Sequence, residues 1–302
     1  MAAPVRLLHE RILSWYAANA RVLPWRDGRT SPWGVLVSEV MLQQTPVARV
    51  EPVWRTWMER WPTPAALAAE SPGEVVRAWG RLGYPRRALR LHQAASVIVS
   101  EYHGDLPSEQ SALRELPGIG EYTAAAVAAF GFGADAVVVD TNVRRVLARV
   151  VGGEAQAAPA LTRAEWRRAA DAVPADRQES VTWNVAVMEL GALICTARTP
   201  RCPQCPVRDL CAWSIAGSPA YAGPPRRGQA WAGTDRQVRG AVLGALRHAE
   251  GPLHRAAIDA ALDALSPMPG IRQRDRAVSS LIEDGLVEVS RRGGEQFLGL
   301  PL

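Results

Sequence analysis

Lysine is absent from this chain of 302 residues, so arginine supplies all 35 Lys and Arg positions. A compositional preference of the genome for arginine codons explains such a bias, but its chemical consequence is the same whatever the cause. Enzymes that form a Schiff base with a sugar need an unprotonated amine as the nucleophile. Side-chain amine chemistry of that kind is therefore excluded, and only the α-amino group at the N-terminus remains.

Cysteine is scarce and confined to one window, since all four cysteines lie between residues 195 and 211. Scattered disulfides would not concentrate every thiol in one short segment, whereas a single metal site would. No segment approaches the roughly 20 apolar residues that span a bilayer. The N-terminal segment lacks the apolar core of a signal peptide, because Arg6, Glu10 and Arg11 interrupt it. We therefore expect a soluble, cytoplasmic protein with no membrane contact.

The residues that are abundant favour helices and a polyanionic partner. Ala, Leu, Val and Arg dominate, the net charge is +5 and the isoelectric point is about 9.4. Ser31 and Pro32 form a typical helix start. Trp54, Trp57 and Trp61 have helical spacing and are expected in the core. The apolar periodicity predicts helices over 4–19, 31–44, 64–70, 72–81, 85–102, 108–116, 121–133, 141–152, 162–173 and 178–195.

The C-terminal part has a different pattern. Residues 217–235 are rich in Gly, Pro and small side chains, which is typical of a linker. Helical patterns follow at 236–249, 254–265 and 272–285, and two β-prone runs, LVEVS and EQFLGL, flank RRGG. Three helices and a hairpin are the pattern of a winged helix. Its charges are nearly balanced, so DNA binding and plain packing both remain open for this region.

A hairpin motif, LPGIG at 116–120, stands between two predicted helices. Two glycines permit a tight turn and close approach of a ligand, and the next helix N-terminus offers N–H groups to a phosphate. Such a hairpin can grip the DNA backbone without reading its sequence, and an ordinary helix–helix turn is the alternative. Asp140 follows about twenty residues later, after the apolar run AVVVD that we expect to be an extended loop. An acid there also serves as a helix N-cap.

The cysteine spacing is C-x6-C-x2-C-x5-C, formed by Cys195, Cys202, Cys205 and Cys211. Zinc sites usually combine two C-x2-C pairs or include histidine, whereas four thiolates also hold an iron–sulfur cluster. The spacing chemistry alone leaves both metals open.

Together, the hairpin, the downstream Asp140 and the four cysteines resemble the helix-hairpin-helix DNA glycosylase superfamily. Within it, the chain from about residue 5 to 222 resembles the adenine DNA glycosylases of the MutY family. The stretch LPWRDGRTSPWGVLVSEVMLQQT (23–45) is similar to the segment of that family that bears a catalytic glutamate, here Glu39. LGY at 82–84 is similar to its DNA wedge. Tyr122 stands where bifunctional relatives carry their Schiff-base lysine.

The resemblance implies specific roles for these residues. Glu39 would protonate adenine, and Asp140 would stabilise the sugar cation. Tyr122 would hydrogen-bond to the reaction centre, and Asn142 would help orient Asp140 or a phosphate. It implies a [4Fe–4S] cluster on the four cysteines. Residues expected to contact DNA are Gln44, Thr45, Leu82, Gly83, Tyr84, Arg86, Gly118, Gly120 and Arg26. The run Arg86, Arg87 and Arg90, just after the wedge, is also expected to meet phosphates, and a solvated helix face is the alternative.

The implied fold is all-α with a small winged-helix-like C-terminal domain. A cluster domain is expected over 1–30 and 135–222, a six-helix barrel over 31–134, a linker over 223–235 and the winged-helix-like domain over 236–302. We expect a monomeric, monofunctional glycosylase that hydrolyses the N-glycosidic bond of adenine opposite 8-oxoguanine or guanine in double-stranded DNA. A thymine glycosylase for T·G mismatches and a non-catalytic, cluster-containing DNA-binding protein are the alternatives.

The chain departs from the family pattern in three places. Val185 replaces a Gln or Glu that touches adenine, and Pro85 replaces the second residue of a Tyr-Tyr pair. The usual Nudix-like C-terminal domain, which inspects 8-oxoguanine, is not visible. These differences place the preference for 8-oxoguanine over guanine in question.

Overall fold

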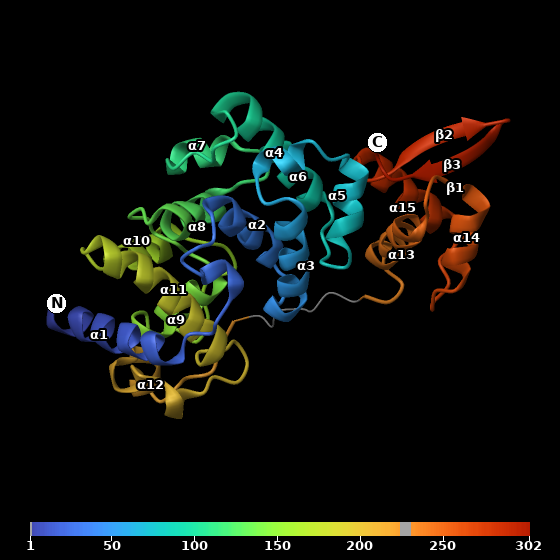
Figure 1. The fold of residues 1–302 in the computed structure, drawn as a ribbon. Helices are drawn as coiled ribbons and strands as arrows, with labels where there is room; N and C mark the ends of the chain where they lie inside the picture. Colours follow the sequence, from blue (N-terminus) through green and yellow to red (C-terminus); the bar gives the residue numbers. More distant parts are fainter. Residues whose placement is uncertain (1, 224–230) are drawn as a thin grey trace. The chain divides into compact units, whose positions relative to one another are not determined.

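The fold is mostly helical (Figure 1). A computed structural model describes residues 2–223 and 231–302, so most of the expected linker lies outside the described residues. The α-helices are α1 (Ala2–Asn19), α2 (Pro32–Leu42), α3 (Val47–Arg60), α4 (Pro64–Ala68), α5 (Pro72–Trp79), α6 (Arg86–Tyr102), α7 (Gln110–Glu115), α8 (Glu121–Phe132), α9 (Thr141–Val150), α10 (Arg163–Asp171), α11 (Arg177–Leu193), α12 (Ala212–Ile215), α13 (Asp235–His248), α14 (Arg255–Asp263) and α15 (Ile271–Glu283). Short 3-10 turns are η1 (Pro24–Arg26), η2 (Cys202–Gln204) and η3 (Arg208–Leu210). The helices predicted from periodicity are confirmed, with ends that differ by a few residues.

The chain forms two compact units. The first consists of Met1–Glu39, Ser108–Glu115 and Ile119–Pro224, and the second of Val40–Pro107, Leu116–Gly118 and Pro225–Leu302. This division groups the C-terminal region with residues 40–107, whereas the sequence suggested a separate domain there. The domain limits drawn from the sequence therefore stay a prediction.

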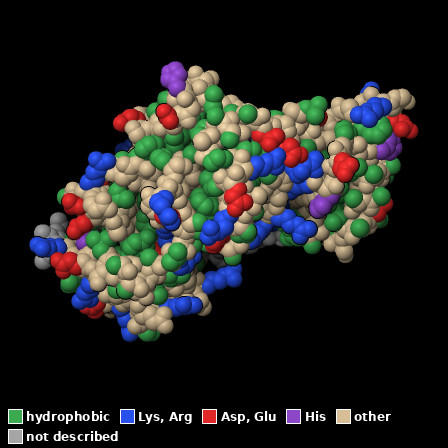
Figure 2. Space-filling model, viewed as in Figure 1, with side chains coloured by type: hydrophobic (Ala, Val, Ile, Leu, Met, Phe, Trp, Pro, Cys, Tyr) green, Lys and Arg blue, Asp and Glu red, His purple; other side chains and the backbone are tan. Residues whose placement is uncertain are grey.

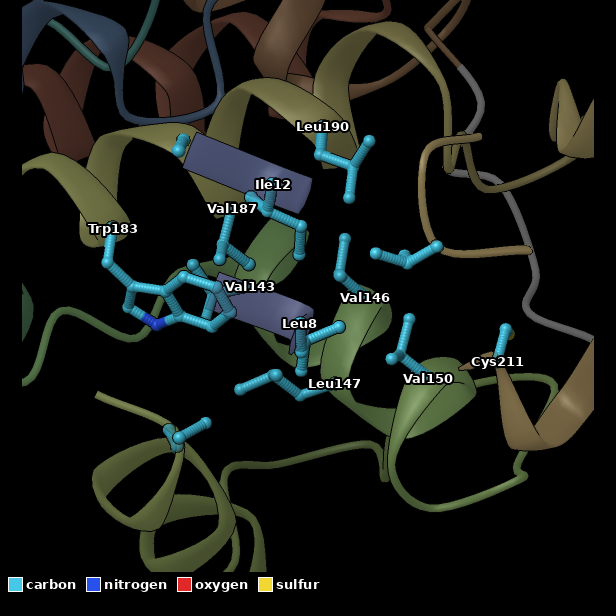
Figure 3. Close-up of a cluster of buried hydrophobic side chains, with 14 of the residues drawn as sticks. Leu8, Ile12, Val143, Val146, Leu147, Val150, Trp183, Val187, Leu190 and Cys211 are labelled. Atoms are coloured by element: carbon cyan, nitrogen blue, oxygen red, sulfur yellow. The ribbon is translucent and has the colours of Figure 1, made fainter. Parts of the chain in front are cut away.

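The core of the first unit lies between α1, α9 and α11. Figure 3 shows Leu8 and Ile12 of α1 facing Val146 and Val150 of α9, with Leu190 of α11 beside them. All five side chains are buried. Apolar residues at three- and four-residue spacing give each helix one apolar stripe, and burying the three stripes together removes that surface from water. This core fixes α9, whose first residue follows Asp140.

The segment AVVVD, which ends at Asp140, is extended and belongs to no sheet, as expected. The buried Asn184 of α11 replaces a neighbouring strand. Its side-chain oxygen accepts from the backbone N–H of Val138 at 3.1 Å, and its amide donates to the carbonyl of Ala136 at 2.8 Å. Unpaired buried backbone groups are costly, so this side chain is what makes a buried extended segment tolerable.

In the second unit, tryptophans form the centre of the helical packing. Trp54 and Trp57 of α3 and its C-cap Trp61 are buried, which confirms the predicted core role. The Trp57 ring meets Trp61 and Trp79 edge to face, with centroids 4.8 and 5.5 Å apart. Edge-to-face contacts of this kind add to the burial of large apolar surfaces. They hold α3 against α5, the helix that leads into the LGY segment.

The C-terminal region consists of α13, α14, α15 and a three-stranded antiparallel sheet in the order β1-β3-β2 (Figure 1). The strands are β1 (Leu253–His254), β2 (Glu288–Arg292) and β3 (Glu295–Gly299). The predicted helices and hairpin are therefore present. The strand β1 was not predicted, because two residues are too few to show a strand pattern. The assignment to the winged-helix class remains a prediction.

The C-terminal region packs on α5. Arg77 of α5 donates to the backbone carbonyls of Leu246 and Ala249 at 3.3 and 3.0 Å. Gly73 lies directly against the Pro301 carbonyl, where a Cβ atom would come within 2.3 Å of the oxygen. Val76 of α5 belongs to the same buried apolar cluster as α13, α14 and α15. Of the helices in the described part of the chain, none is both long and apolar enough to cross a membrane.

Candidate active site and cluster centre

Glu39 lies on a helix that is apolar on every side. Ser31 begins α2 as its N-cap, since its hydroxyl accepts from the N–H of Gly34 at 3.2 Å, as predicted. Val35, Val37 and Val40 are buried around the helix, and only 5% of Glu39 is exposed. A carboxyl group held in such surroundings is expected to favour its neutral form.

Tyr122, 83 positions further along the chain, meets this carboxyl group. Its hydroxyl donates to Oε2 of Glu39 at 2.8 Å. Burial raises the pKa of Glu39 to about 7, the Tyr122 hydrogen bond offsets part of that effect, and Asp140 raises it further. Burial likewise raises the pKa of Tyr122 well above its usual value. The pair therefore holds a carboxyl group that is half-protonated near neutral pH beside a neutral phenol.

Asp140 caps the start of α9. Its Oδ1 accepts from the N–H of Val143 at 2.6 Å, and its Oδ2 accepts from the side-chain amide of Asn142 at 2.7 Å. Arg145 in turn donates to Oδ1 of Asn142 at 2.7 Å. Burial raises the pKa of Asp140 above its ordinary value, while these hydrogen bonds and the charge of Arg145 act in the opposite direction. Asp140 is thus a cap and a reaction-site candidate at once.

Arg26 was expected to contact DNA, but the structure directs it inward. Its guanidinium nitrogen lies 3.0 Å from Oε2 of Glu189, whose side chain is fully buried, and its charge acts on Glu39 and Tyr122. Arg21 donates to Oε1 and to Oε2 of Glu189 at 2.6 and 2.8 Å. Sequence reasoning missed Glu189. The sequence feature that could have indicated Glu189 is its position as an acid on the buried, largely apolar face of α11.

The hairpin at 116–120 uses its two glycines differently. Gly118 has φ = +80°, and a Cβ atom there would lie 2.8 Å from Cβ of Arg90. Gly120 has ordinary extended backbone as the N-cap of α8, without a side-chain cap. A Cβ atom at Gly120 would meet nothing within 4 Å. The turn therefore needs Gly118, while Gly120 leaves the first turn of α8 open to a ligand.

Two loops that follow α2 and α5 come together. Thr45 donates its hydroxyl to the carbonyl of Leu82 at 3.1 Å, and the hydroxyl of Tyr84 donates to Oε1 of Gln44 at 2.7 Å. Tyr84 is 48% exposed, whereas Leu82 is buried. Leu82 thus lies beneath the loop that presents Gly83 and Tyr84. The DNA contacts that the family resemblance implies for these residues remain predictions.

The arginines after this loop do not all face outward. Arg86 is exposed and pairs with Asp284 of the C-terminal region at 3.2 Å. Arg87 turns inward and donates to backbone carbonyls. Its expected contact with phosphate is therefore wrong, because its guanidinium is already committed inside the protein. On the face drawn in Figure 2, basic side chains lie among acidic and hydrophobic ones and form no continuous basic patch.

The four cysteines surround one cavity, which Leu190, Ile194 and Trp213 also line. Among the described residues, no three His, Cys, Asp or Glu side chains converge closely enough to hold one metal ion. Burial raises the pKa of Cys205 to about 11, and the other three thiols add to the effect. Four thiols around one cavity form the donor set that an iron–sulfur cluster requires.

Arg149 completes this centre from the last turn of α9. It donates to Sγ of Cys195 at 3.4 Å and to the carbonyl of Thr196 at 2.8 Å, and it stacks on Trp213 at 4.8 Å. Its side chain is buried. A buried guanidinium beside four thiolates offsets their negative charge. The residues present therefore fit the iron–sulfur cluster that the family resemblance implies.

Two family profiles match the chain. Residues 37–170 match the HhH-GPD superfamily base excision DNA repair proteins, and residues 195–211 match the iron–sulfur binding domain of endonuclease III. The second match contains all four cysteines, and it decides for an iron–sulfur cluster over zinc. The [4Fe–4S] cofactor predicted from the sequence is confirmed.

The chain is also similar to named proteins over most of its length. It is 53% identical to the adenine DNA glycosylase of Mycolicibacterium smegmatis, over 96% of this chain and 97% of the relative. It is 51% identical to that of Mycobacterium tuberculosis, over 95% and 92%. A thermostable thymine-DNA glycosylase of solved structure has a TM-score of 0.63 at 27% identity, covering 70% of this chain and 97% of that one.

Proposed function

The chain belongs to the adenine DNA glycosylase family of the HhH-GPD base excision repair proteins, and we propose that it excises adenine mispaired with 8-oxoguanine or guanine in double-stranded DNA. We propose further that it acts as a monomer at the nucleoid and that it hydrolyses the N-glycosidic bond without cutting the strand.

The observation that carries this proposal is the buried Glu39 carboxyl group, hydrogen-bonded to Tyr122 and with a pKa of about 7. Adenine leaves readily only after a ring nitrogen has gained a proton. A general acid works best when its pKa lies near the operating pH. Glu39 meets that condition, so it delivers the proton to N7 of an adenine that has been turned out of the duplex.

Asp140 serves the second half of the reaction. Departure of the base leaves an oxocarbenium-like sugar, and a nearby carboxylate stabilises that charge electrostatically or covalently before water attacks. Asn142 holds one oxygen of Asp140 and the N–H of Val143 holds the other. Two carboxyl groups with different protonation states are a recurrent arrangement in glycosidases.

The reaction ends in hydrolysis, because the chain has no lysine. Tyr122 stands at the start of α8 and offers a hydroxyl but no amine. A Schiff base with the sugar, which would lead to strand cleavage, therefore lacks a side-chain amine as its nucleophile. This supports a monofunctional enzyme.

DNA would be held at several points of the fold. The open N–H groups after Gly120 suit a phosphate, while Gln44, Thr45, Gly83 and Tyr84 would line the gap left by the base. Leu82 would support that loop from below, Arg86 would reach phosphate on release from Asp284, and Arg26 would act through Glu189 at the pocket. Cys195, Cys202, Cys205 and Cys211 would hold the cluster, which ties α9 and α11 to the cysteine loop.

Excision across opposing bases tests the proposal. Labelled duplexes with A·8-oxoG, A·G and T·G pairs are incubated with the protein and then treated with alkali, and a control omits the alkali. We expect cleavage at adenine, only after alkali, and none at thymine. Glu39→Gln and Asp140→Asn variants should bind the A·G duplex and release no adenine. Release of thymine alone, or full activity in either variant, would contradict the assignment.

A further inference from the structure

Arg87 lies at the junction of the two loops that follow α2 and α5. One of its nitrogens, Nη1, donates to three backbone carbonyls, and Nη2 donates to a hydroxyl and a fourth carbonyl. The acceptors are the carbonyls of Val40 (2.7 Å), Met41 (3.2 Å), Gln43 (2.7 Å) and Gly83 (3.0 Å) and Oγ1 of Thr45 (3.1 Å). Five acceptors from two separate segments thus depend on one side chain.

The first of these segments is the end of α2. The last carbonyls of a helix have no partner within the helix, and a cation is favoured there. Arg87 binds the carbonyls of Val40 and Met41, the two residues that directly follow Glu39. It therefore fixes where the helix of Glu39 ends.

The second segment is the loop that carries Tyr84. Gln44 and Tyr84 have φ values of +56° and +47°, the left-handed region that side-chain-bearing residues rarely adopt. Such strain persists only where the surroundings over-determine it. The acceptors Gln43, Thr45 and Gly83 are the immediate neighbours of these two strained residues. The Arg87 guanidinium also lies 5.4 Å from the Tyr84 ring and 5.2 Å from that of Trp79.

We propose that Arg87 is a positioning residue, which sets the exposed Tyr84 ring at a fixed place relative to the C-terminal end of α2, so that the ring fills the gap left by an extruded base. This inference rests on the proposed glycosylase function. Extruding a paired base breaks its stacking and pairing interactions, and an inserted side chain offsets part of that loss. A misplaced ring no longer offsets the cost of extrusion. The loss matters only for an adenine that must first be separated from a paired base.

Arg87→Lys tests the proposal with little change in size or charge. An ammonium group has three donors and no planar fork, so it cannot serve five acceptors in two segments. Arg274→Lys is the matched control. Arg274 also donates to backbone carbonyls, those of Pro269 and Asp259 at 2.9 and 3.1 Å, but it lies in the C-terminal region away from Tyr84. Both variants are compared with the wild type by thermal unfolding.

Two duplexes separate positioning from general damage. One carries adenine opposite guanine, and the other carries adenine opposite an abasic site, where no base pair must be broken. Single-turnover excision by Arg87→Lys should fall by between about tenfold and hundredfold on the first duplex, and by less than about threefold on the second. 2-Aminopurine placed beside the mispaired adenine should brighten less on binding Arg87→Lys than on binding the wild type. Arg274→Lys should match the wild type in both assays.

Three results would overturn the proposal. The first is an equal fall in the excision rate of Arg87→Lys on both duplexes. The second is excision of the paired adenine by Arg87→Lys at the wild-type rate. The third is a 2-aminopurine signal with Arg87→Lys that equals the wild-type signal. The fluorescence assay does not require bond cleavage. A wild-type protein that unstacks DNA but releases no adenine would therefore refute the proposed function separately from the role of Arg87.

Discussion

Replacing the buried acid Glu39 with glutamine should make the protein more stable and inactive, and the gain in stability should grow with pH. Glu39 has a pKa of about 7 in the folded protein, against 4.5 as the ordinary value. Between these values the folded chain binds a proton that the unfolded chain does not. The stability contributed by this group is therefore fully present below pH 4.5 and is lost as pH rises through about 7. Glutamine stays neutral and avoids the loss.

The expected size follows from the shift. Each pKa unit corresponds to about 1.4 kcal/mol, so ionised Glu39 costs the folded state about 3 kcal/mol at pH 8.5. At pH 5.5 the cost is only about 1 kcal/mol, because that pH lies one unit above the unfolded-state pKa. The advantage of Glu39→Gln should thus rise by about 2 kcal/mol between these pH values. The glutamine oxygen can still accept from Tyr122, which keeps the local geometry.

Thermal unfolding of both proteins at pH 5.5 and 8.5 measures the effect. The difference in melting temperature between Glu39→Gln and the wild type should therefore be larger at pH 8.5 than at pH 5.5, by on the order of 5 °C. Glu165→Gln is the control with the opposite sign. Burial favours the neutral form of Glu165, but the N–H groups of Thr162 and Ala158 together with Arg144 lower its pKa. Its stabilisation is present above the unfolded pKa and lost as pH falls, so this variant should be less stable at both pH values. A Glu39→Gln advantage that is constant or shrinks with pH would refute the reasoning.

Three further predictions follow from the same contacts. Tyr122→Phe removes a hydrogen bond that lowers the Glu39 pKa, so the alkaline limb of the single-turnover excision profile should move up by about one pH unit; an unmoved limb would separate Tyr122 from the acid. Gly118→Ala should destabilise the fold by about 1–3 kcal/mol in thermal unfolding and weaken duplex binding, since Gly118 has φ = +80° and faces Arg90; Gly120→Ala, with open space at its Cβ, should cost under about 1 kcal/mol. Arg149→Met should lower the visible absorbance of the purified protein, because it leaves Cys195 and Thr196 without their donor; retention of full absorbance in air would contradict that role.

The sequence alone determined the local features of this protein. Helical spacing identified the helices and the tryptophan core, because both depend on residues three or four apart. The cysteine spacing identified a metal site, and the family resemblance implied that it holds an iron–sulfur cluster. The absence of lysine excluded side-chain amine chemistry before any fold was known. Glu39, Tyr122 and Asp140 were named individually, on motifs that lie within short segments.

Tertiary structure alone decided how these groups act on one another. The hydrogen bond between Glu39 and Tyr122 joins residues 83 positions apart, and the burial that raises the Glu39 pKa depends on packing. The exposed-looking run of three arginines divides, because Arg86 meets Asp284 while Arg87 turns toward the end of α2. Glu189 became visible as a site residue only when Arg21 and Arg26 closed around it. Periodicity reports which face of a helix is apolar, but it carries no information on which distant polar group a buried charge will meet, since that partner is chosen by the folded backbone.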